Sequence, residues 1–172
     1  MSAARARAAR SLPGGATELP PWLAGHGRFF LDTNVLVYCF DAREPGKQAT
    51  ARALVAEALS SQRGLISSQV VQELLNVATR RFAVPLRADD ARLVLDEVLA
   101  PLCEVAGSVA LCREALGIAE RWQLSFYDAL IVAGALAGHC ETLYSEDLQD
   151  GLRIRELTVR NPFTGLPSTA RS

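Results

Sequence analysis

Short apolar segments alternate with helix-like segments along most of this chain. The apolar segments cover residues 29–31, 65–66, 102–106, 142–145 and 154–159, and they have the length of short buried strands. Strict alternation of strands and helices is typical of parallel sheets, because each parallel strand needs a crossover connection to return to the same end. The sequence therefore predicts an α/β fold with a short, mostly parallel sheet flanked by helices.

Serine and glycine residues mark the expected ends of several helices. Serine hydroxyls are good N-caps, so Ser108 and Ser125 are expected to begin helices, as is either Ser67 or Ser68. Gly138 is expected to end the last helix. On this basis the sequence predicts a helical turn over residues 35–40 and helices over 49–59, 67–81, 89–100, 108–122 and 125–138.

The length of 172 residues suits one domain with a full core and is too short for two. Residues 1–27 show no periodicity, contain Pro-Gly and Pro-Pro steps, and carry Arg5, Arg7 and Arg10 with a single acid, Glu18. This composition predicts a disordered N-terminal tail. The folded domain is expected over residues 28–163, followed by a C-terminal tail over residues 164–172.

Net charge and cysteine usage exclude several classes of protein. The net charge of -1 lacks the basic field of a dedicated DNA-binding domain. The four cysteines and two histidines form no zinc-ligand pattern. The start of the chain does not resemble a signal peptide, and no apolar stretch approaches the roughly 20 residues that span a bilayer. The sequence thus favours a cytoplasmic protein with no membrane segment.

Four acidic residues stand where apolar segments meet a turn or a helix start. Asp32 directly follows the first apolar segment, and Asp147 lies just past the fourth. Glu73 falls in the first two turns of one expected helix, and Asp128 falls in the first turn of another. Ligands of open α/β sheets bind beyond the carboxyl ends of the strands. We therefore expect these four side chains to meet at one edge of the sheet.

Each of these acids also has a simpler explanation. Asp32 suits a turn or a helix cap, and Glu73 suits a solvated edge of its helix. The spacing Ser125-x-x-Asp128 resembles a capping box, and Asp147 fits an ordinary loop. On sequence alone both explanations stand for each residue.

Carboxylates that share a cleft repel one another, so they need a cation, and without one the repulsion raises the pKa of some of them. Mg²⁺ takes carboxylate oxygens and water as ligands, and such a site can activate water against a phosphodiester. Thr33, Asn34 and Ser145 are placed to orient the ligands from a second layer. The predicted chemistry is therefore metal-assisted hydrolysis of phosphodiesters.

Four short motifs contain these acids, and they read FLDTN, QVVQE, SFYDALI and LYSEDL. In this order and spacing they resemble the PIN-domain family, and most closely the VapC-type toxins of bacterial toxin–antitoxin pairs. The resemblance runs from about residue 29 to residue 163 and leaves out only the two ends. Residues 1–27 are more than the family needs.

The resemblance implies a PIN-like three-layer sandwich and an endoribonuclease that depends on Mg²⁺ or Mn²⁺. It also implies a homodimer that an antitoxin protein inhibits. Asp32, Glu73, Asp128 and Asp147 take the family's acidic metal-binding and catalytic positions, and Asp150 is a candidate outer ligand.

Three other functions fit parts of the sequence. A PIN nuclease that matures RNA would share every motif, whereas a non-catalytic PIN scaffold that binds RNA or a partner would lack some of the acids. A haloacid-dehalogenase-like phosphatase would use Asp32 as its nucleophile. That enzyme needs a second acid where this chain has Asn34, and it needs a catalytic lysine, whereas Lys47 is the only lysine here.

Two further groups of residues each have two explanations. Three arginines after the helix of Glu73 either steer phosphate groups or solvate a helix end: Arg80, Arg81 and Arg87. Four apolar positions on helices form either a dimer or antitoxin surface or part of the core: Leu54, Val55, Val94 and Leu99.

Overall fold

Six strands form one sheet in the order β3-β2-β1-β4-β6-β5 within residues 27–166, the part of the chain that the computed structural model describes. All neighbouring strands are parallel except β5, which runs antiparallel to β6. The strands are β1 (Phe29–Leu31), β2 (Gly64–Ser67), β3 (Cys103–Val105), β4 (Thr142–Tyr144), β5 (Arg153–Ile154) and β6 (Leu157–Arg160).

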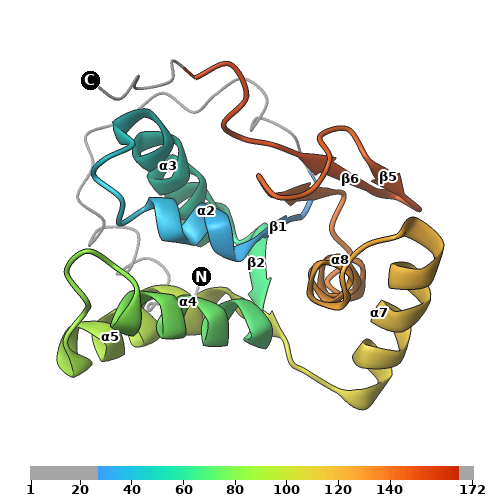
Figure 1. Ribbon diagram of the computed structural model, residues 1–172, viewed down its shortest axis with the longest axis horizontal. Helices are drawn as coiled ribbons and strands as arrows, with labels where there is room; N and C mark the ends of the chain where they lie inside the picture. Colours follow the sequence, from blue (N-terminus) through green and yellow to red (C-terminus); the bar gives the residue numbers. More distant parts are fainter. Residues whose placement is uncertain (1–26, 167–172) are drawn as a thin grey trace.

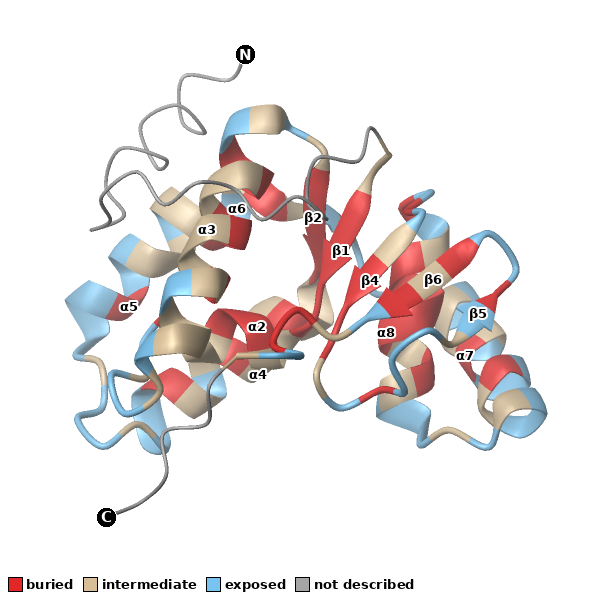
Figure 2. Cartoon of the chain, turned by 90° about the horizontal axis from the view of Figure 1, so that it is seen from above, coloured by how far each residue is buried: buried red, intermediate tan, exposed pale blue. Residues whose placement is uncertain are grey.

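Helices cover both faces of the sheet (Figures 1 and 2). One face carries α2 (Thr33–Tyr38), α3 (Pro45–Ser61), α4 (Ser68–Arg80), α5 (Ala88–Val94) and α6 (Ala100–Leu102). The other carries α7 (Val109–Trp122) and α8 (Phe126–Ala137). This three-layer arrangement around a mostly parallel sheet confirms the predicted fold class.

The core lies at the middle of the sheet, where the central strands are covered on both faces. Phe30, Leu65 and Leu143, from three adjacent strands, are fully buried. The α8 helix packs closely on them, since a Cβ at Gly134 would lie 3.5 Å from the Phe30 ring. Because the helix is anchored over the strands in this way, its N-terminus is held at a set position along the sheet.

The structure differs from the predicted elements in two places. The helix expected to end before Pro101 continues through a π-helical stretch, Leu95–Leu99, into α6. Pro101 lies near the start of α6, within this continuous helical segment, and does not end it. The single strand expected over residues 154–159 is a hairpin, because Arg155 has φ 57° and turns the chain between β5 and β6.

All three predicted helix starts are confirmed, but only Ser108 and Ser125 cap their helices with a side-chain hydrogen bond. Ser108 Oγ accepts a hydrogen bond from Leu111 N at 3.0 Å, and Ser125 caps α8 in the same manner. Ser67 precedes α4 without a capping bond from its side chain. Ser68 Oγ instead accepts from Gly107 N at 2.8 Å, which joins the start of α4 to the loop after β3.

Core packing decides the role of the apolar helix positions that were candidates for a partner surface. Leu54, Val55 and Leu99 are buried in the core, so the surface explanation is wrong for them, and Val94 is half-buried. None of the helices among residues 27–166 is both long enough and apolar enough to cross a membrane.

The predicted N-terminal tail lies outside the described residues except for Gly27, and only residues 164–166 of the predicted C-terminal tail lie within them.

Two glycines give opposite expectations for stability. A Cβ at Gly64 in β2 would lie 2.2 Å from Ala58 Cβ and 2.6 Å from Ala58 Cα, so Gly64→Ala should destabilise the fold by about 1–3 kcal/mol. Gly117 lies within α7 with nothing near its Cβ position, so Gly117→Ala should stabilise by about 0.5–1 kcal/mol. Urea unfolding of both variants measures these changes, and equal changes in the two would contradict the packing of α3 on β2.

Candidate active site

Asp32 lies at the carboxyl end of β1 and is the most enclosed acid of the site, with only 8% of its surface exposed. One carboxylate oxygen, Oδ1, accepts a hydrogen bond from Thr33 N at 2.6 Å and caps α2. The other, Oδ2, accepts from Ser145 Oγ at 2.7 Å and from Asn34 Nδ2 at 3.1 Å. The capping explanation of this residue is thus correct for one oxygen, while the second faces the end of β4.

Burial raises the pKa of Asp32 to about 6. The hydrogen bonds from Ser145 and Thr33 oppose this rise, and the charges of Asp147 and Glu73 add to it. The rise expected from crowded carboxylates is present, but loss of water around Asp32 contributes more to it than repulsion does.

Ser145 and Asn34 connect Asp147 to Asp32. Ser145 Oγ accepts hydrogen bonds from Asp147 N at 3.2 Å and Leu148 N at 3.3 Å while it donates to Asp32. Asn34 Nδ2 lies 3.1 Å from an oxygen of Asp147 and 3.1 Å from an oxygen of Asp32. A single amide group therefore stands between the two carboxylates and holds their spacing.

Glu73 joins the same network through α4. Its Oε2 accepts from Thr33 Oγ1 at 2.6 Å, and its Oε1 accepts from Gln69 Nε2 at 2.9 Å. Gln69 Nε2 also lies 3.3 Å from the carbonyl oxygen of Tyr127 at the start of α8. Sequence reasoning missed Gln69 as part of the site, although its spacing of four residues from Glu73 on one helix was a usable signal.

Asp128 lies at the start of α8 and takes part in a capping box. Its Oδ2 accepts from Ser125 Oγ at 2.7 Å, and its backbone N–H donates to the same hydroxyl at 3.2 Å. Asp32, Glu73 and Asp147 are linked through intervening polar side chains, whereas the described hydrogen bonds connect Asp128 only to Ser125. The capping explanation therefore accounts for the present conformation of Asp128.

Two further charged groups lie in the loop that carries Asp147. Asp150 Oδ1 accepts from Asn161 N at 2.9 Å, which braces the loop against the end of β6. Lys47, which sequence reasoning also missed, pairs with Glu146 and donates to the Tyr38 hydroxyl at 2.9 Å. The ammonium group also lies 4.5 Å from the centre of the Tyr38 ring. This half-buried cation therefore holds the residue next to Asp147 against α2.

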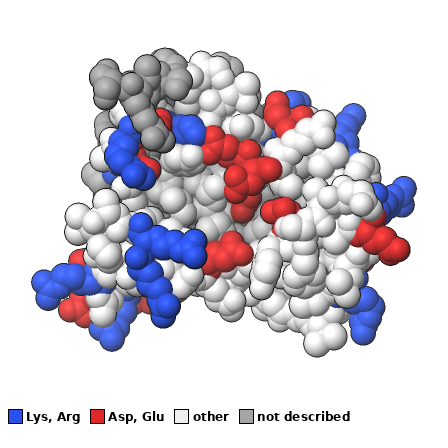
Figure 3. Space-filling view, in the orientation of Figure 1, with Lys and Arg blue, Asp and Glu red and all other residues white. Residues whose placement is uncertain are grey.

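The face that carries these residues is acidic and hollowed. Figure 3 shows Asp and Glu side chains gathered along a hollow in the middle of this face, with Lys and Arg side chains beside it toward α4 and α5. Within residues 27–166, no three Asp, Glu, His or Cys side chains lie close enough together to form a metal site by themselves. The buried Asp32 with its two acidic neighbours nevertheless fits a hard cation such as Mg²⁺, which binds through one or two carboxylates and completes its shell with water.

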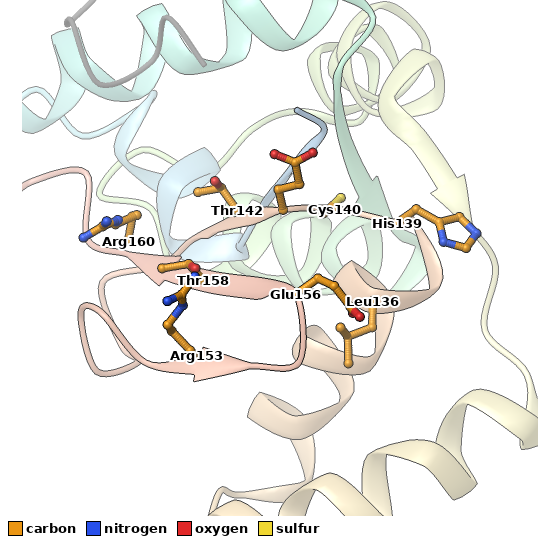
Figure 4. Close-up of a pocket in the computed structure, with 9 residues that line it drawn as sticks. Leu136, His139, Cys140, Thr142, Arg153, Glu156, Thr158 and Arg160 are labelled. Carbon is orange, nitrogen blue, oxygen red and sulfur yellow. The ribbon is translucent and has the colours of Figure 1, made fainter. Parts of the chain in front are cut away.

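One pocket of the described residues lies away from these acids. It has a volume of about 750 Å³ and is lined by residues of α8, β4, β5 and β6 and the loops between them. Figure 4 shows Thr142, Arg153, Thr158 and Arg160 around it. It contains none of the four predicted acids, so the Asp32 cluster does not lie in this pocket.

Comparison with known proteins gave one family and several solved structures. The family model described as "PIN domain" matches residues 29–151. No curated protein sequence matches this chain. A toxin–antitoxin complex from Klebsiella pneumoniae is 20% identical, covers 77% of this chain and 96% of its own, and has a TM-score of 0.55.

Two other solved structures are similar. VapBC2 from Rickettsia felis, bound to a DNA fragment from its promoter, is 20% identical, covers 77% of this chain and 97% of its own, and has a TM-score of 0.51. VapC20 from Mycobacterium tuberculosis, a toxin that cleaves the sarcin–ricin loop, is 22% identical. It covers 69% of this chain and 89% of its own, and has a TM-score of 0.47. At 20% identity, the two structures with TM-scores above 0.5 show the fold alone.

The raised pKa of Asp32 predicts a specific pH dependence of stability. Between the ordinary value of 3.8 and about 6 the folded state binds more protons than the unfolded state, so ionising Asp32 lowers the free energy of unfolding as pH rises. Asp32→Asn removes the cost of ionising this carboxyl. In EDTA at pH 7 the free energy of unfolding of the variant should therefore exceed that of the wild type by up to about 3 kcal/mol. Denaturant unfolding from about pH 4 to about pH 7 measures the difference between the two proteins.

Adding Mg²⁺ should stabilise the wild type, because the ion favours the ionised carboxylate. The difference in free energy of unfolding between the wild type and Asp32→Asn should then become smaller. Parallel pH profiles of the two proteins in EDTA would show that Asp32 ionises at its ordinary pKa.

Proposed function

Because this chain belongs to the PIN-domain family, we propose that it is a divalent-metal-dependent endoribonuclease that hydrolyses RNA phosphodiester bonds. Nucleases of this family generally use divalent metal ions. The observation that carries the proposal is the hydrogen-bonded network that holds the buried Asp32 beside Asp147 and Glu73 at one end of the sheet.

In this proposal Asp32, Glu73, Asp128 and Asp147 hold Mg²⁺, and Mn²⁺ is a substitute. A bound ion supplies Lewis-acid activation of water and neutralises charge on the phosphate. Glu73 is gripped at both oxygens, by Thr33 and Gln69, so its carboxylate is oriented before any ligand arrives.

Asn34 fixes the distance between Asp32 and Asp147 in the same way. These supports are the outer layer that a metal site needs to keep its ligands in place. Asn34 also argues against the phosphatase alternative. An amide that donates to the Asp32 carboxylate cannot serve as the second acid of that mechanism.

The proposed substrate is RNA, held at its phosphates. Arg80 and Arg81 are exposed at the C-terminal end of α4, and Arg87 is exposed before α5. Cationic side chains there attract a polyanion that the acidic site itself would repel. RNA affinity is therefore expected to fall as salt rises.

A role as the toxin of a type II toxin–antitoxin pair is the proposed biological setting, with an antitoxin protein as partner, a homodimer as the working form and a cytoplasmic location. The structural likeness to two toxin–antitoxin complexes favours this setting over RNA maturation. A groove of about 360 Å³ between α4 and α5, lined partly by Leu75, Ala91 and Leu95, is the proposed place for an antitoxin segment.

Purified protein should cleave structured RNA in Mg²⁺ and lose this activity in EDTA. Asp147→Asn removes one charged ligand from an exposed position, so it should slow cleavage by about a hundredfold or more while the protein stays folded. Asp96→Asn is the matched control, because Asp96 is an exposed acid on the π-helical stretch and should leave cleavage unchanged.

Cleavage that persists in EDTA, or in the folded Asp147→Asn protein, would rule out the metal mechanism. Expression in bacteria adds a cellular measurement, since the wild type should arrest growth and Asp147→Asn should not. Cleavage without arrest would support a PIN nuclease outside toxin systems.

Asp128 can be tested apart from its capping role. Asp128→Asn keeps an oxygen that can accept from Ser125 but loses the charge, so RNA cleavage should fall at least about tenfold with little change in stability. Ser125→Ala removes the cap of α8 and should lower stability by about 1 kcal/mol with cleavage largely retained. If the folded Asp128→Asn protein cleaved RNA at the wild-type rate, the role of Asp128 would be helix capping alone.

A further inference from the structure

Two aromatic side chains lie exposed at the start of α8, directly before Asp128. Tyr127 is 66% exposed and Phe126 is 36% exposed, and their ring centres lie 5.7 Å apart at an interplanar angle of 73°. Large aromatic side chains usually lose most of their exposure on folding, because they bury a large apolar area. A pair left in water beside a catalytic cluster therefore needs an explanation.

The backbone of this aromatic pair is tied to the acidic network. Gln69 Nε2 reaches the carbonyl oxygen of Tyr127 at 3.3 Å and an oxygen of Glu73 at 2.9 Å. Ser125, the residue before the pair, caps α8 and holds Asp128. The aromatic rings thus belong to a helix start that is held in a set position relative to the carboxylates.

We infer that Phe126 and Tyr127 form a stacking platform for an unpaired nucleobase next to the phosphate that is cleaved. This inference rests on the proposed ribonuclease function and extends it from the phosphate to the base. Exposed aromatic faces stack on bases of single-stranded or looped RNA, and every base offers such a face. The substrate class is therefore RNA with an unstacked base at the cleavage site.

The other exposed apolar side chains do not combine these features. Val109 and Leu116, both on α7, are aliphatic, so they cannot stack on a base through a ring face. Phe40 already packs against Phe82, with ring centres 5.3 Å apart at the ends of α2 and α4. Tyr127 has both an aromatic ring and a hydrogen-bonded connection to Glu73, through its own carbonyl oxygen and Gln69.

The test measures binding in the Asp147→Asn background, so that the RNA stays intact. The probe is a short single-stranded oligouridylate that carries one 2-aminopurine, a fluorescent base that is quenched when it stacks. Tyr127→Leu keeps an apolar side chain but loses the ring, so it should raise the Kd about tenfold and reduce the quenching. Tyr127→Phe should restore both, and Leu116→Ala, with similar exposure on α7, should change neither.

Each outcome decides the inference. Normal Kd and quenching in the Tyr127→Leu protein overturn the stacking platform, while the ribonuclease proposal stands if the wild-type protein cleaves RNA. A change in oligomeric state on light scattering, without a change in RNA binding, overturns it in favour of a protein interface. If the folded wild-type protein neither binds nor cleaves RNA, the proposed function fails and the platform fails with it.

Discussion

The carboxylate of Asp32, held out of water at the end of β1, is the constraint on which the site depends. Its burial follows from the fold, because β1 lies between β2 and β4 and Asp32 directly follows β1 at this central position. A charge in such a place is costly unless hydrogen bonds or a cation compensate it. Thr33, Asn34 and Ser145 supply the hydrogen bonds, and they bring Glu73 and Asp147 to the same place.

Small polar side chains therefore organise this site more than the acids themselves do. Each oxygen of Asp32 already has a donor, as does each oxygen of Glu73. Such prior ordering lowers the entropic and reorganisation costs that would otherwise be met at the moment of reaction. Lys47, the single lysine of the sequence, also contributes to this ordering. It pairs with Glu146, the residue next to Asp147, and so holds the loop of Asp147 in place.

Sequence reasoning could predict the alternation of strands and helices and the end of the sheet where the acids gather, because both follow from local apolar patterns and the geometry of parallel crossovers. It could not predict the β5–β6 hairpin, because Arg155 adopts a left-handed conformation without a glycine to signal it. Gln69 and Lys47 escaped notice for another reason. Their partners Tyr127 and Glu146 are 58 and 99 residues away along the chain, and no local pattern encodes these two contacts; only the bond from Gln69 to Glu73 had a local signal, the spacing of four residues on one helix.

The hydrogen bond between Ser145 and Asp32 joins residues 113 positions apart, and the bond between Asp147 and Asn34 spans the same separation. Contacts between residues so far apart in sequence form late in folding, because the entropic cost of closing the loop must be met before the contact can stabilise the fold. A ribosome-bound chain that has not yet emerged through β4 has Asp32 and Glu73 but no Ser145 to join them to Asp147. The order of synthesis thus keeps the network around Asp32 incomplete until nearly the whole domain is made.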